Sequence, residues 1–231
     1  MRSSGERTRD ECIRRAALIG EVELIEGVAP FSAVLRETYE IGATFEGQEW
    51  VPVIDGDVLL EEGAILRGIE ELRGRRDIFC LDGKTKDKIL AKKRRAGIHI
   101  YRRELLEAAL DYVGESLKPE TRAREAMALR HRKATFIGEV IYGRHDHEQY
   151  YRDLWRKAFI QTQKLRKTLK RRDYIGKWRQ LATAGDDDYR VILAAHRAGN
   201  REEGTLRFDA TENYGALEGL RRLGIEEKRP L

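Results

Sequence analysis

The sequence contains little cysteine, and this scarcity excludes one kind of site. Only Cys12 and Cys80 occur among its 231 residues. Two distant cysteines without CxxC spacing cannot build a cysteine-based zinc site. A reducing, intracellular setting is therefore expected, with a single disulfide between the two left open.

Long apolar runs are also absent. No run approaches the roughly 18–20 residues that cross a bilayer. Residues 1–15 are charged and lack the apolar core of a signal peptide. The chain is expected to be soluble, without a membrane partner, and intracellular (cytoplasmic) or held within a virion or nucleoprotein particle.

Charge is abundant, and its two signs are segregated along the chain. Residues 1–83 hold 10 Lys/Arg against 18 Asp/Glu, whereas residues 84–180 hold 27 against 12. Residues 181–231 are slightly acidic. Such segregation implies either a polyanionic partner or an acidic part that docks on the basic part. The polyanion is the favoured interpretation. Three domains follow: an acidic α/β subdomain (1–83), a basic, mainly helical region that faces nucleic acid (84–180), and a C-terminal helical segment with a tail (181–231).

Hydrophobic periodicity predicts an α+β fold that is mainly α. Short helices are expected at 11–25, 31–41, 64–72, 104–113 and 119–133, with two more at 189–198 and 214–223. Strand-like residues around Asp55-Gly56-Asp57 predict a β-hairpin at 49–60. Residues 84–95 are expected to form a cationic helix that ends at Gly97. Asp146 is expected to cap one long amphipathic helix that runs to about residue 172.

The basic region supplies the candidate binding residues. Phosphate affinity rises with every charge that is neutralised, so the density of cations matters more than their order. Tyr174 and Trp178 lie among cations and could stack on unpaired bases. The predicted nucleic-acid-binding residues are Lys92, Lys93, Arg94, Arg95, Arg130, Arg132, Lys133, Lys164, Arg166, Lys167, Lys170, Arg171, Arg172, Tyr174, Lys177 and Trp178.

A second cluster resembles catalytic chemistry more closely. Glu139, His145, Asp146, His147 and Glu148 combine imidazoles and carboxylates that could hold a divalent metal. Residues two apart point to opposite sides of a helix, however, and this argues against convergence of His145 and His147. The favoured interpretation is that these residues form the solvent-exposed start of a helix. No catalytic residue, metal ligand or cofactor is therefore predicted.

These patterns predict a non-catalytic nucleic-acid-binding protein. It would act as a subunit of a nucleoprotein assembly, coat-like or part of a ribonucleoprotein, with RNA or DNA as partner. Its acidic first third would dock on the basic face of a neighbouring subunit. Two alternatives stay open: a metal-dependent nuclease that uses His145, His147 and Glu139, and a scaffold that binds an acidic protein.

Overall fold

The computed structural model describes residues 1–116, 118–165, 171–202 and 213–231, without the side chains of residues 164, 165 and 171–173. The chain forms two compact units. Unit 1 comprises Met1–Asp87 and Lys93–His147, and unit 2 comprises Lys88–Lys92 and Glu148–Leu231. The three segments predicted from charge (1–83, 84–180 and 181–231) are defined by sequence composition rather than by contacts, and they stay a prediction.

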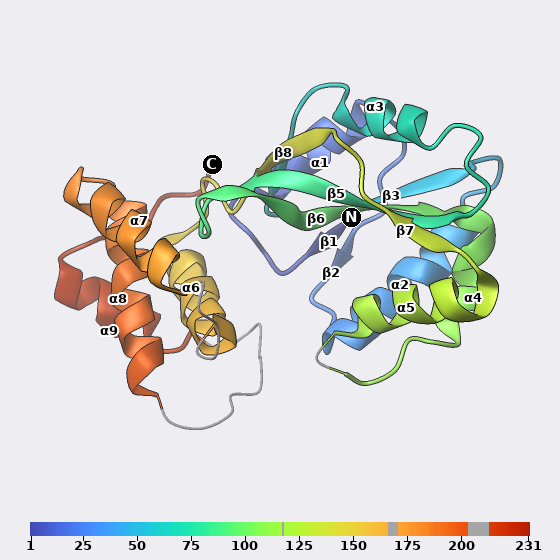
Figure 1. The fold of residues 1–231 in the computed structure, drawn as a ribbon. Helices are drawn as coiled ribbons and strands as arrows, with labels where there is room; N and C mark the ends of the chain where they lie inside the picture. The colour runs from blue at the N-terminus through green and yellow to red at the C-terminus, as the bar shows by residue number, and fades with distance from the viewer. Residues whose placement is uncertain (117, 166–170, 203–212) are drawn as a thin grey trace. The chain divides into compact units, whose positions relative to one another are not determined.

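Unit 1 is built around a mixed six-stranded sheet (Figure 1). Its strands follow the order β3-β6-β5-β8-β4, and β7 pairs with β5 beside β8. β3 and β4 are consecutive in the chain but lie at opposite ends of this order, so the sheet is nearly closed on itself. The strands are β3 (Trp50–Ile54), β4 (Val58–Leu60), β5 (Ile78–Asp87), β6 (Lys92–Arg102), β7 (Ala134–Phe136) and β8 (Ile141–His145).

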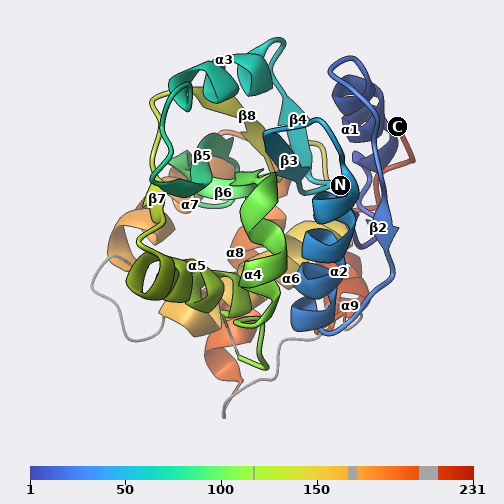
Figure 2. The same cartoon turned by 90° about the vertical axis from the view of Figure 1, so that its right-hand side faces the viewer.

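Helices cover both faces of this sheet (Figure 2). Alternation along β6 explains the two cores: Ile98 and Ile100 face one, whereas Tyr101 faces the other. The first core packs under α1 (Arg9–Ala17) and α3 (Ala64–Glu71). The second packs under α2 (Phe31–Thr44), α4 (Leu106–Leu110) and α5 (Pro119–His131), with a 3-10 turn, η1 (Arg103–Leu105), before α4. A separate two-stranded pair joins β1 (Arg2–Ser3) to β2 (Ile25–Glu26).

Unit 2 is helical and has a core of its own. Trp155, Trp178 and Ile192 are among its buried residues. Its helices are α6 (Tyr151–Leu165), α7 (Arg171–Thr183), α8 (Asp187–Arg201) and α9 (Ala216–Leu223). Asp186 caps α8 by accepting a hydrogen bond from the Asp188 N–H. Among the described residues, no helix is long and apolar enough to span a bilayer.

The prediction of a mainly α fold is wrong. The stretch 84–95 is not a helix, because it forms the end of β5 and the start of β6. Its true period is two: Thr85 and Asp87 are buried, while Lys86 between them is exposed. The alternation was missed because its buried positions, Thr85 and Asp87, carry no apolar residue.

Two further elements differ from their predictions. The expected hairpin at 49–60 has both strands, but they pair with β6 and β8 rather than with each other. The expected long helix begins at Tyr151, not at Asp146, and α7 begins at Arg171. Asp146 has a φ of 62° and is not a helix cap. The helix that begins at Pro119 is confirmed.

Candidate metal centre

Four polar side chains meet at one end of the unit 1 sheet. β5 and β8 are parallel, with Asp87 opposite His145 in the register, so their carboxyl ends lie at the same edge. Asp57 joins them from the link between β3 and β4, because the next residue, Val58, pairs with His145. Asp146 follows His145 directly. The carboxyl ends of parallel strands are where α/β sheets commonly hold ligands.

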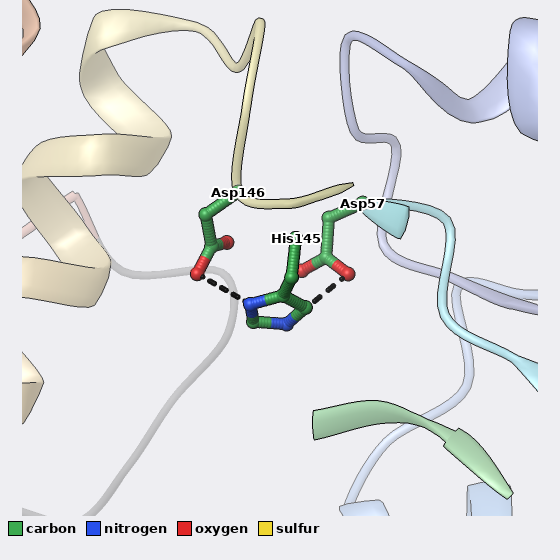
Figure 3. Close-up of side chains that lie close together, drawn as sticks. All are labelled: Asp57, His145 and Asp146. Carbon is green, nitrogen blue, oxygen red and sulfur yellow. Dashed lines mark ion pairs between the residues drawn. The ribbon is translucent and has the colours of Figure 1, made fainter. Parts of the chain in front are cut away.

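The imidazole of His145 is surrounded by carboxylates (Figure 3). Its Nδ1 lies 2.9 Å from Asp146 Oδ2 and 3.0 Å from Asp87 Oδ2, and its Nε2 lies 3.5 Å from Asp57 Oδ1. All four side chains are almost fully buried. Ligand atoms of Asp57, His145 and Asp146 lie within 4.8 Å of one another.

Two backbone features permit this approach. Asp146 adopts a left-handed φ of 62°, which short polar residues tolerate better than others. Gly97 of β6, with φ of 70°, passes so close that a Cβ there would lie 2.9 Å from His145 Cδ2 and 2.4 Å from Val58 Cγ2. Only glycine satisfies both the conformation and the contact.

The electrostatics of the cluster favour a cation at its centre. Burial alone would lower the pKa of His145. The negative charges of Asp146 and Asp57 outweigh burial, and hydrogen bonds to Asp146 and Asp87 add to their effect, so the pKa of His145 lies well above its usual value. Arg94 adds a second positive charge through a 2.5 Å bond from its Nε to Asp87 Oδ2. Without a bound metal ion, protonated His145 and Arg94 together hold the three carboxylates.

A second buried ion network lies elsewhere in unit 1. Glu120 accepts from Tyr101 (2.6 Å) and pairs with Arg2 (3.1 Å) and His99 (3.1 Å). His99 Nδ1 lies 3.4 Å from Asp82, and Asp82 also binds Arg124 at 3.2 Å. Each acidic group here has basic partners within the network, so it is a structural element rather than an open site.

The predicted nucleic-acid-binding residues are spread over both units. Lys93, Arg94, Arg95, Arg130, Arg132 and Lys133 belong to unit 1, and Lys92, Tyr174, Lys177 and Trp178 belong to unit 2. Arg166, Lys167 and Lys170 lie outside the described residues, as do the side chains of Lys164, Arg171 and Arg172. The Trp178 ring is 1% exposed and donates to the Ile89 carbonyl, so it cannot stack on a base.

The cations of β5 and β6 meet carboxylates of their own unit. Lys84 pairs with Glu139, Lys86 with Glu61, and Arg94 with Asp87. Similarly, Arg95 lies 3.7 Å from Asp82, and Arg102 binds Glu49. Three of these carboxylates, Glu49, Glu61 and Asp82, belong to residues 1–83, so the acidic first third neutralises part of the basic region within unit 1.

Comparison with known proteins is limited to fold. No protein-family model matches the chain, and no curated protein matches its sequence. A 4-diphosphocytidyl-2C-methyl-D-erythritol synthase from Anaerococcus prevotii is similar with a TM-score of 0.38 and 15% identity, over 60% of this chain and 68% of that one. A glycosyltransferase involved in glycosylation of the major capsid of PBCV-1 is similar with a TM-score of 0.38 and 10% identity, over 59% of this chain and 79% of that one. At these scores the likeness assigns no activity to this chain.

The prediction of a non-catalytic nucleoprotein subunit is wrong. Cations that were expected to face a polyanion are paired with carboxylates within unit 1. The nuclease alternative also chose the wrong partners for His145. Glu139 binds Lys84, and among the described residues the group around His145 contains Asp57 and Asp146 but not His147.

Sequence reasoning placed His145 and Asp146 in one possible metal-binding cluster and missed Asp57 and Asp87. Asp57 was assigned to a hairpin turn, Asp87 to a cationic helix and Asp146 to a helix cap. No spacing in the sequence joins positions 57, 87 and 145, because the pairing of β4 and β5 with β8 brings them together. The usable signal was Asp87 at a buried position of an alternating strand.

Proposed function

We propose that this protein binds a divalent metal ion through Asp57, His145 and Asp146. The convergence of one imidazole and two carboxylates, buried and within 4.8 Å, carries the proposal. Metal bonds of about 2.1 Å place two ligands at right angles about 3.0 Å apart. The 2.9 Å between His145 Nδ1 and Asp146 Oδ2 agrees with that spacing.

The ligand set favours a borderline cation. Carboxylates suit Mg²⁺ and Mn²⁺, whereas an imidazole among them shifts preference toward Mn²⁺ or Zn²⁺. A bound ion would take the place of the proton on the coordinating nitrogen of His145. Asp57, on the Nε2 side of the ring at 3.5 Å, would have to move to coordinate an ion at Nδ1. Asp87 would then lose its hydrogen bond to Nδ1 and keep its ion pair with Arg94.

The surroundings favour an anionic substrate. Arg94 donates to Asp87 and is about one third exposed (34%), so its guanidinium can also meet a phosphate or carboxylate. Arg144, one residue before His145, is exposed. A divalent ion beside an arginine polarises a phosphoryl oxygen and neutralises charge that develops there. We therefore propose metal-dependent chemistry on a small phosphate-bearing substrate.

Metal binding is tested directly with Mn²⁺. Titration followed by electron paramagnetic resonance should show one tight site, and Asp57→Asn, Asp146→Asn and His145→Gln should each weaken it at least about tenfold. Glu139→Gln is the matched control, because Glu139 is an exposed carboxylate that binds Lys84. Equal Mn²⁺ affinity in the wild type and all three ligand variants would refute the site.

The substrate class is tested separately. Inorganic pyrophosphate and p-nitrophenyl phosphate, incubated with the Mn²⁺-loaded protein, should release phosphate at a rate that Arg94→Gln lowers without changing Mn²⁺ affinity. A protein that binds Mn²⁺ but releases no phosphate from either probe would retain the metal site and lose the proposed substrate class.

A further inference from the structure

The β3 edge of the unit 1 sheet is covered only at its C-terminal end among the described residues, where Arg2 of β1 bridges Asp55 and its carbonyl accepts from the Gly56 N–H. The bonds from Asp55 N to Gly97 O and from Arg103 N to Glu49 O show that odd-numbered residues of β3 bond to β6. In an antiparallel ladder the even-numbered residues then point their backbone groups outward. The N–H and C=O of Trp50 and the C=O of Pro52 therefore face away from the sheet, and no described group bonds to them.

The sequence of β3 agrees with this position. Proline donates no backbone hydrogen bond, so in sheets it is confined mainly to edge strands. Pro52 stands opposite Ile100 in the register, with its missing donor on the outer side. The strand at the opposite end of the order, β4, has its outer edge covered. Side chains of α1 cap the free carbonyls of β4, since Cys12 Sγ donates to Val58 and Arg15 to Leu60.

A cavity of about 440 Å³ runs along the open edge. All five residues of β3 line it, with apolar side chains from the end of α1 and from α3. Ile19 and Leu66 on its wall are large apolar residues that are 36% and 59% exposed. An unpaired edge beside exposed apolar side chains is a template for an added strand.

Apart from the Met1 ammonium, the charged groups of the cavity wall are carboxylates. Glu21, Glu23 and Glu46 line it, and no Lys, Arg, His or Asp does. None of the three carboxylates forms an ion pair with a described residue, and all three are exposed. This differs from neighbouring carboxylates, because Glu11, Glu26 and Glu49 each bind an arginine.

We propose that the open edge of β3 binds an extended peptide segment of a partner protein, in which apolar residues alternate with Lys or Arg. The segment would add a strand to the sheet by bonding to Trp50 and Pro52. Its apolar side chains would enter the cavity, and its cations would meet Glu21, Glu23 and Glu46. This strand addition is independent of the proposed metal site.

The test uses the full-length protein and a labelled peptide of alternating lysine and valine, about eight residues long. Fluorescence anisotropy should show saturable binding that weakens as salt is added. Replacing Glu21, Glu23 and Glu46 together by Gln should weaken it about tenfold. The matched control replaces Glu40, Glu107 and Glu125, three exposed carboxylates of the same unit, by Gln.

Strand pairing is tested on the peptide. N–H groups of an extended chain alternate in direction, so N-methylation at alternate residues blocks pairing in one set and leaves it in the other. The peptide methylated on the N–H groups that face β3 should lose binding, and the peptide methylated on the other N–H groups should retain it. Equal binding by both sets, or equal competition by a simple alkylamine, would overturn strand addition. Absence of saturable binding up to about 1 mM peptide would overturn the docking site altogether.

Discussion

Tyr142 is fully buried in the core of unit 1, and its hydroxyl has no hydrogen-bond partner among the described residues. Burial, and then the nearby charge of Glu71, raises the pKa of Tyr142, so the group stays neutral. A buried hydroxyl without a partner costs about 1–3 kcal/mol. Tyr142→Phe should therefore raise the free energy of unfolding by about 1 kcal/mol in urea denaturation. A loss of more than about 1 kcal/mol would show that the hydroxyl has a partner.

Both cysteines are free and buried, Cys12 on the inner face of α1 and Cys80 on β5. Burial raises the pKa of the Cys12 thiol to about 12 and that of Cys80 further, so neither is a thiolate at neutral pH. The native protein should react with Ellman's reagent far more slowly than the same protein in urea, which should give two thiols at once. Rapid labelling of one thiol in the native state would contradict this burial.

At the scale of elements, the sequence predicted helices better than strands. The helices that begin at Phe31, Ala64 and Pro119 were predicted close to their true starts. The failure at 84–95 has a physical cause, since strand burial there is carried by Thr85 and Asp87 rather than by apolar residues. The ligands of the candidate metal centre could not be predicted from the sequence for a related reason. Its ligands depend on pairing between strands far apart in sequence, and local periodicity does not encode that pairing.

Close packing of α9 against α6 gives a prediction for one element. A Cβ at Gly219 would lie 2.1 Å from Cη2 of Trp155, whose indole is buried and donates to the Tyr214 carbonyl. Gly219→Ala should destabilise unit 2 by about 1–3 kcal/mol, because overpacking displaces a rigid ring. Gly176→Ala in α7 is the matched control, since nothing lies within 4 Å of its added Cβ. Alanine there should be neutral or stabilising by up to about 1 kcal/mol in the same thermal melts.

For the molecule as a whole, the uneven charge of the sequence is resolved largely inside the fold. Glu61 and Asp82 of the first third bind Lys86 of β5 and Arg95 of β6. Asp57 belongs to the candidate centre, and Asp82 also belongs to the network around Glu120. The excess charge that suggested a polyanion is thus partly structural. Glu21, Glu23 and Glu46, which form no ion pair with a described side chain, gather at the wall of one cavity.

The network around Glu120 makes the stability of unit 1 depend on acid pH. Burial would raise the pKa of Glu120, but His99 and Arg2, with hydrogen bonds from His99 and Tyr101, lower it well below 4.5. A folded-state pKa below the unfolded one gives stability that is present above pH 4.5 and lost as pH falls through the folded value. The free energy of unfolding should therefore fall below pH 4.5, and Glu120→Gln should flatten that decline.

At neutral pH the same variant should cost about 3 kcal/mol, because Arg2 and His99 each lose one of their two carboxylate partners in a buried position. Glu11→Gln is the control, since its pKa is lowered to about 2 by Arg14 and Arg15 in an exposed position where solvent screens the pairs. Urea denaturation at intervals between pH 3 and pH 7 separates the two variants. Parallel stability curves for the wild type and Glu120→Gln would mean that protonation of Glu120 does not contribute to acid unfolding.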